Sequence, residues 1–166
     1  MTAPPALSYS FGSTRVAILD TDYILNQLKD RVRFGIGCRT SAGPPVGQAR
    51  SFASSHVLQE LYKADALGNR DKWDKLAKQS QSEGWPRRPD TFREIFESEY
   101  LEDITFVNVS GMFEDDPIAQ KVRLRGASDT PTAQLAVLLA RARPIVHSHD
   151  HSLWEPGLAP APERFQ

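Results

Sequence analysis

The sequence has little of what a secreted or membrane protein needs. It contains one cysteine, Cys38, so no disulfide bond can form within the chain, and a reducing compartment is the default setting. No apolar run approaches the roughly 20 residues that a helix needs to cross a bilayer. The opening residues, MTAPPALSYSFGSTR, lack the charged start and apolar centre of a secretion signal. These absences favour a cytoplasmic protein with no membrane contact.

An excess of charge of one sign is also missing. Twenty Lys and Arg stand against 21 Asp and Glu, which gives a formal net charge of -1. This balance excludes the strongly basic surface of a protein that coats nucleic acid. It still allows a local basic stripe, and residues 31–50 hold four arginines and no acid. From this stretch we expect Arg31, Arg33 and Arg39 to contact a nucleic-acid backbone.

The length of 166 residues suits one domain with its own hydrophobic core. Residues 1–14 are rich in Pro, Ala, Ser and Gly, which predicts a flexible N-terminal arm. Residues 158–166 are rich in Pro and Ala and predict a tail. The domain is therefore expected to span residues 15–157.

Within that span, short apolar runs alternate with segments of helical periodicity. Strands are expected at residues 15–19, 104–109 and 145–148. Helices are expected at 23–28, 56–67, 71–82, 91–100, 116–125 and 132–143, with a loop over 31–50. This alternation predicts an α/β fold in which a central parallel sheet has helices on both faces. Ligands of such sheets bind beyond the carboxyl ends of the strands.

Acidic residues occupy the positions where that rule places ligands. Asp20 follows the first strand, Asp150 follows the last, and Asp129 begins the helix that leads into the last strand. Glu60 lies in an upstream helix, and Asp22 adds a fifth carboxylate. Crowded carboxylates repel one another unless a cation neutralises them, and oxygen ligands suit Mg²⁺ or Mn²⁺. We therefore expect all five side chains to bind such a metal.

Four segments in this order resemble the motifs of the PIN-domain nucleases. The segments read VAILDTD from Val16, VLQEL from Val57, DTPTAQLA from Asp129 and IVHSHD from Ile145. The resemblance covers most of the chain, from about residue 15 to residue 157. It departs from the family at Asp22, where asparagine is more frequent, and in the longer segments 31–50 and 71–100.

The resemblance implies a single PIN-like domain and a metal-dependent endoribonuclease. Asp20, Glu60, Asp129 and Asp150 would be the catalytic residues, holding one or two Mg²⁺ or Mn²⁺ ions for in-line hydrolysis that leaves a 5′-phosphate. RNA would be the substrate, with DNA as an alternative. Many relatives are toxins that pair with an antitoxin protein, and homodimers are common among them.

Two other functions remain open from the sequence. The segment Asp20-Thr-Asp22 also resembles the first motif of haloacid-dehalogenase-like phosphatases, for which Asp116 and Lys121 could supply later parts. The chain could also be a catalytically silent PIN-like interaction module.

Individual residues have alternative roles as well. Asp20 and Asp129 could merely cap helices, and Glu60 could pair with His56 or Lys63. The hydroxyls of Thr130 and Ser148 could bind a phosphate or a metal-bound water. The pair His147 and His149 could bind zinc, although no cysteine lies nearby to complete such a site.

Overall fold

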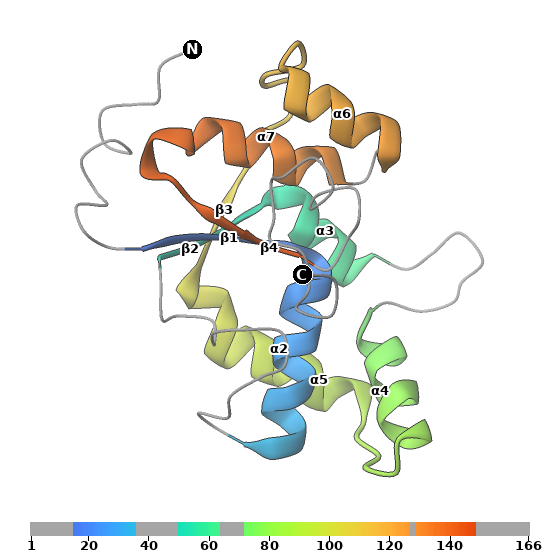
Figure 1. Ribbon diagram of the computed structural model, residues 1–166. Coiled ribbons are helices and arrows are strands. Elements are labelled where there is room, and N and C mark those ends of the chain that lie inside the picture. The colour runs from blue at the N-terminus through green and yellow to red at the C-terminus, as the bar shows by residue number, and fades with distance from the viewer. Residues whose placement is uncertain (1–14, 36–49, 64–71, 127–128, 149–166) are drawn as a thin grey trace, which may run out of the picture.

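Four parallel strands form the centre of the fold in the computed structural model (Figure 1). The structure describes residues 15–35, 50–63, 72–126 and 129–148. The strand order is β3-β2-β1-β4, and the strands are β1 (Val16–Leu19), β2 (Arg50–Ser54), β3 (Ile104–Val107) and β4 (Ile145–His147). The predicted α/β class with a parallel sheet is confirmed.

The order of the strands determines where a ligand can bind. From β1 the chain moves outward through β2 to β3, and it then returns to place β4 on the other side of β1. Strand order therefore reverses between β1 and β4. In doubly wound sheets this switch point opens a crevice at the carboxyl ends of the two strands.

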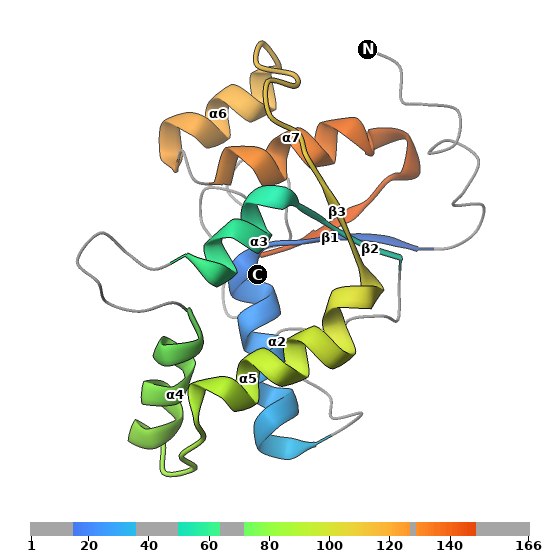
Figure 2. The same cartoon turned by 180° about the vertical axis from the view of Figure 1, so that it is seen from behind.

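Helices cover both faces of the sheet, as expected (Figures 1 and 2). One face carries α6 and α7, and the other carries α2, α4 and α5. The α-helices are α2 (Thr21–Phe34), α3 (Ser55–Tyr62), α4 (Lys72–Ser82), α5 (Pro89–Ile95), α6 (Pro117–Arg125) and α7 (Thr130–Leu138). No helix in these described ranges combines the length and the apolarity that crossing a bilayer requires.

Alternation of side chains along the strands divides the interior into two cores. Val16 and Ile18 of β1 belong to a core that includes side chains of α6 and α7. Ala17 and Leu19 face the opposite way, into a core that includes side chains of α2, α3, α4 and α5. Each core is apolar because both faces of a parallel sheet are covered.

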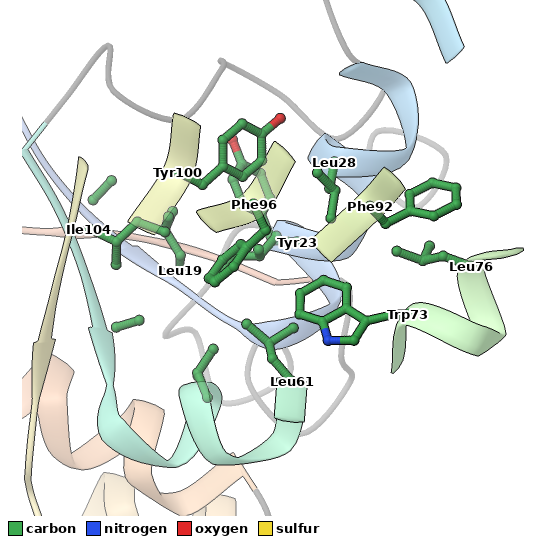
Figure 3. Close-up of a cluster of buried hydrophobic side chains, with 14 residues drawn as sticks. Leu19, Tyr23, Leu28, Leu61, Trp73, Leu76, Phe92, Phe96, Tyr100 and Ile104 are labelled. Carbon is green, nitrogen blue, oxygen red and sulfur yellow. The ribbon is translucent and has the colours of Figure 1, made fainter. Parts of the chain in front are cut away.

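The second core is rich in aromatic rings (Figure 3). The ring centroids of Trp73 and Phe96 lie 5.5 Å apart, and those of Phe96 and Tyr100 lie 6.4 Å apart in an edge-to-face arrangement. Such separations are favourable for aromatic pairs. Phe96 and Tyr100 bound a five-residue π-helical turn that continues α5 and is followed by the 3₁₀ turn Leu101–Asp103. This cluster joins α4 and α5 to the sheet.

Several sequence predictions were wrong in their bounds. The helix expected over residues 23–28 runs to Phe34, so residues 31–34 are helical rather than loop. Arg31 and Arg33 in its last turn interact favourably with the helix dipole, and Gly35 ends the helix at a positive φ of 99°. The strand expected over residues 104–109 ends at Val107.

Strand β2 was not predicted at all. Its sequence, RSFAS, contains two apolar residues and two serines, which is too weak a pattern for a buried strand. The helix expected over residues 132–143 begins earlier, at Thr130, and ends at Leu138. A 3₁₀ turn, Ala140–Ala142, follows it. The predicted arm (1–14) and tail (158–166) lie outside the described residues.

Candidate functional site

Asp20 lies at the switch point between β1 and β4. Its backbone N–H donates to the carbonyl of His147 at 3.1 Å, which extends the pairing of the two strands. Its Oδ1 accepts from the Thr21 amide at 2.9 Å, and its Oδ2 accepts from the Ser148 hydroxyl at 2.8 Å. The carboxylate is therefore buried and fixed in orientation at the place where the topology favours ligand binding.

Two rows of side chains cross the strands on the face covered by α7. The first is apolar, packs in one core and consists of Ile18, Phe52 and Val146, which are paired in register. The second row follows two residues further along the chain in each case, and it consists of Ser54, the last residue of β2, and of Asp20 and Ser148, which directly follow β1 and β4. Because side chains alternate between faces, this second row lies on the same face as the first. We call these sets the apolar row and the polar row.

Two further carboxylates act on Asp20. Burial, together with the negative charges of Asp22 and Asp129, raises the pKa of Asp20 to about 7. The hydrogen bonds from Ser148 and from the Thr21 amide act in the opposite direction. Asp22 belongs to the first turn of α2, whereas Asp129 immediately precedes α7. Three acidic residues from two distant parts of the sequence thus interact at the carboxyl edge of the sheet.

Asp129 is buried, yet it does not act as the helix cap that was one alternative for it. Its side chain makes no capping hydrogen bond to α7. Asp116 does cap its helix, since its Oδ1 accepts from the amides of Ile118 and Ala119 at 2.9 and 3.1 Å. Asp116 is one of the acids that could supply a later part of the phosphatase alternative, and it is engaged at the start of α6.

Three hydroxyls near these acids are buried without a hydrogen-bond partner in the described part of the chain. They belong to Thr21, Ser54 and Thr130. Thr21 and Thr130 each follow one of the interacting aspartates, and Ser54 is a member of the polar row. A buried hydroxyl without a partner lowers stability, so this group of three indicates a place that a ligand could complete.

The structure does not bring Glu60 into the group of charges that raise the pKa of Asp20. Its Oε1 lies 3.1 Å from Nε2 of His56, one turn earlier in α3. This is one of the pairings expected as an alternative to metal binding. The role of Glu60 as a ligand stays a prediction.

The predicted nucleic-acid contacts lie apart from the acids. Arg31 makes two hydrogen bonds to Glu99, at 2.9 and 2.7 Å. The Arg33 guanidinium lies over the rings of Phe34 and Trp85, 4.8 and 5.6 Å from their centroids. At 1.5 Å per residue, about 16 Å of helix separates Asp20 from Arg31. Neither arginine is therefore beside the carboxylate group.

Other predicted site residues fall outside the described ranges. These are Arg39, His149 and Asp150. His147, the other half of the proposed zinc pair, stacks on Tyr23 with ring centroids 4.7 Å apart. Burial lowers the pKa of His147, and the charge of Arg15 adds to this effect. A neutral, stacked imidazole is well explained by packing alone.

The donor chemistry of the site suits a hard divalent cation. Carboxylate and hydroxyl oxygens are what Mg²⁺ and Mn²⁺ prefer. Within the described residues, however, no three His, Cys, Asp or Glu side chains lie close enough to form a complete metal centre. The charges of Asp22 and Asp129 can still act on Asp20, because charge repulsion acts over a longer range than a coordination bond. The acids are gathered at one edge, and the fit to a metal rests on their oxygen chemistry and on the unpartnered hydroxyls beside them.

Sequence reasoning found Asp20, Asp22 and Asp129 but missed Ser54 as part of this site. The available signal was its position directly before a helix, which favoured a capping role. Ser54 makes no capping hydrogen bond. Comparison of the chain with protein-family models, with curated proteins and with solved structures gives no match.

Proposed function

We propose that this protein is a metal-dependent nuclease that hydrolyses phosphodiester bonds in RNA. The observation that carries the proposal is the convergence of Asp20, Asp22 and Asp129 at the switch point of a parallel sheet. Ligand sites of doubly wound folds occur at this point. A group of like charges, two of them buried, is poorly explained by stability, because each charge raises the cost of ionising its neighbours.

A divalent cation would supply the missing positive charge. When bound, Mg²⁺ or Mn²⁺ neutralises carboxylates, polarises a phosphodiester and makes water a better nucleophile. Asp20, Asp22 and Asp129 would supply the negative charge that attracts it, with Glu60 and Asp150 as the further ligands predicted from the sequence. RNA supplies the phosphodiester, and an antitoxin partner and a homodimer remain predictions of the family resemblance.

The surrounding residues prepare Asp20 for this task. Ser148 and the Thr21 amide hold its two oxygens in place, so little reorganisation is needed when a cation arrives. Burial of the carboxylate reduces screening by water and so strengthens its attraction to a cation. The same burial makes Asp20 expensive to ionise when no cation is present.

The direct test is cleavage of RNA by purified protein with Mn²⁺ and with a chelator. We expect Asp20→Asn and Asp129→Asn to lose at least about 100-fold in rate, which corresponds to roughly 3 kcal/mol of transition-state stabilisation. The control is Asp103→Asn, which removes an exposed carboxylate from the 3₁₀ turn before β3 and should leave the rate unchanged. The products should carry a 5′-phosphate.

Equal cleavage by all four proteins would contradict the proposal and indicate a contaminating nuclease. Release of phosphate from a small monoester, without RNA cleavage, would favour the phosphatase instead. Binding of Mn²⁺ without either activity would favour the silent interaction module.

A further inference from the structure

Ser54 and Ser148 flank Asp20 from the two neighbouring strands, but they are used differently. Ser148 donates a hydrogen bond to Asp20. Ser54 lies opposite Asp20 if the register of β1 with β2 is continued by two residues beyond Ile18 and Phe52. Its side chain is 1% exposed, and its hydroxyl has no hydrogen-bond partner in the described residues. Ser54 also makes no capping bond to α3, although it occupies the capping position.

Thr130 shows the same combination on a different element. It is the first residue of α7 and follows Asp129, whose charge acts on Asp20. It is 6% exposed, and its hydroxyl also lacks a partner in the described part of the molecule. In Figure 1 the starts of α3 and α7 both lie at the end of the sheet from which α2 departs. Two unpartnered hydroxyls thus come from two elements that begin at one sheet edge.

The charges at this edge determine which ligand these hydroxyls could serve. A phosphate would be repelled by Asp20, Asp22 and Asp129, whereas a cation would be attracted. Mg²⁺ gives up its water reluctantly and usually keeps several water molecules in protein sites. Such water needs hydrogen-bond partners on the protein, and within the described residues no group of three or more His, Cys, Asp or Glu side chains is placed to hold the ion by itself.

We propose that Ser54 and Thr130 are positioning residues that hold water molecules of the hydrated divalent cation through their hydroxyl oxygens. The inference depends on the cation of the proposed function, and it specifies how that cation is held. Asp20, Asp22 and Asp129 supply the negative charge, while the two hydroxyls orient the hydration shell around it. In the metal-free protein the same hydroxyls are buried without a partner, so they reduce stability.

The experiment compares stability and metal affinity in the same variants. Ser54→Ala and Thr130→Val each remove a hydroxyl with little change in packing. We expect both variants to keep or raise the melting temperature in a chelator, because an unsatisfied buried hydroxyl has been removed. We expect both to bind Mn²⁺ at least about 10-fold more weakly by calorimetry, as is usual when an outer-shell partner of a metal is lost.

A matched control is available in Ser80, which is buried but has partners. Its hydroxyl donates to the Ala77 carbonyl at 2.7 Å and accepts from the Arg87 amide at 2.9 Å. Ser80→Ala should lower the melting temperature and leave Mn²⁺ affinity unchanged. The control is thus expected to differ from Ser54→Ala in both melting temperature and Mn²⁺ affinity.

The outcomes separate this inference from the proposed function. If the wild-type protein binds no Mn²⁺, or binds it as well after Asp20→Asn, the cation itself is wrong and both proposals fail. If binding depends on Asp20 but is unchanged in Ser54→Ala and Thr130→Val, only the inference is overturned. A lower melting temperature with unchanged affinity would assign the hydroxyls a structural role and would overturn it equally.

Discussion

The apolar row lies on three neighbouring strands, and the polar row lies two residues further along, at or just beyond the ends of the same strands and on the same face of the sheet. Their burial is the same, since none of the six side chains is more than 7% exposed. Their contributions to folding are opposite in sign. Burial of an apolar side chain contributes roughly 1.5–3 kcal/mol, whereas burial of a polar group costs free energy unless it is bonded.

The difference between the two rows shows that this fold loses folding free energy at the carboxyl edge of the sheet. Behind the edge, the apolar row packs against α7 and holds the strands in register. At the carboxyl edge, the same register brings the Asp20 carboxylate and the hydroxyls of Ser54 and Ser148 together in a buried position. The rigid apolar row is what keeps the polar row in a fixed arrangement, and preorganised polar groups are what binding and catalysis require.

The largest effect is expected from breaking the apolar row. Phe52→Ala should lower the free energy of unfolding by about 3–5 kcal/mol, because it leaves a cavity between the sheet and α7. Urea denaturation measures this loss. Phe34→Ala is the control, since that ring is 62% exposed and its removal should change stability by less than about 0.5 kcal/mol. Similar losses in the two variants would mean that Phe52 is not in the core.

Ionisation of Asp20 should give the next largest effect, and it depends on pH. Its pKa is about 7 in the folded protein against 3.8 for an unperturbed aspartate, so the native state binds more protons than the unfolded state between those values. The contribution of Asp20 to the free energy of unfolding is therefore fully present below about pH 4 and is lost as the pH rises through 7. With about 1.36 kcal/mol for each pKa unit, the loss is at most about 4 kcal/mol.

Comparison with Asp20→Asn isolates this contribution from those of other acids. In a chelator the variant and the wild type should have similar stability near pH 4, and the variant should be the more stable near pH 8. Added Mn²⁺ should stabilise the wild type at pH 8 and have little effect on the variant. A difference between the two proteins that does not change with pH would show that Asp20 is not perturbed.

The same contrast explains what the sequence could predict. Asp20 and Asp129 could be named because Asp20 directly follows a strongly apolar segment and Asp129 begins the helix that leads into the last strand. The parallel α/β class followed from the alternation of those segments. Gathering of these two acids at one edge then followed from the wiring of a parallel sheet.

Other features depend on tertiary structure and could not be predicted. Strand β2 has few apolar residues and is stabilised by its pairing with β1 and β3 on both sides. Without β2 in the prediction, Ser54 could not be placed beside Asp20. Arg31 was expected to bind nucleic acid because residues 31–50 hold four arginines and no acid. Its ion-pair partner, Glu99, lies 68 residues away in the sequence. Local charge patterns do not reveal such distant pairs.

A smaller effect should follow from Ser148→Ala, which sharpens the comparison within the polar row. Removal of its hydrogen bond to Asp20 should cost about 1.5–3 kcal/mol where the carboxylate is ionised. Because this bond lowers the pKa of Asp20, the pKa should rise further in the variant, and the pH-dependent loss of stability should extend to higher pH. Ser54→Ala should do neither. If Ser148→Ala and Ser54→Ala changed stability and the pKa of Asp20 equally, the two serines would not differ in their interaction with Asp20.

The smallest effect is expected far from both rows, at the ion pair of Arg31 with Glu99. Both side chains are partly exposed, so Glu99→Gln should cost no more than about 1 kcal/mol in urea denaturation. Mn²⁺ affinity should be unchanged, since this pair lies near the opposite end of α2 from Asp20.

Breaking the pair also tests the expected contact of Arg31 with RNA. If Arg31 serves structure alone, Arg31→Gln and Glu99→Gln should lose similar stability and leave RNA affinity unchanged. A loss of RNA affinity in Arg31→Gln, with a gain in Glu99→Gln where the arginine is released, would instead assign Arg31 to the RNA-binding surface.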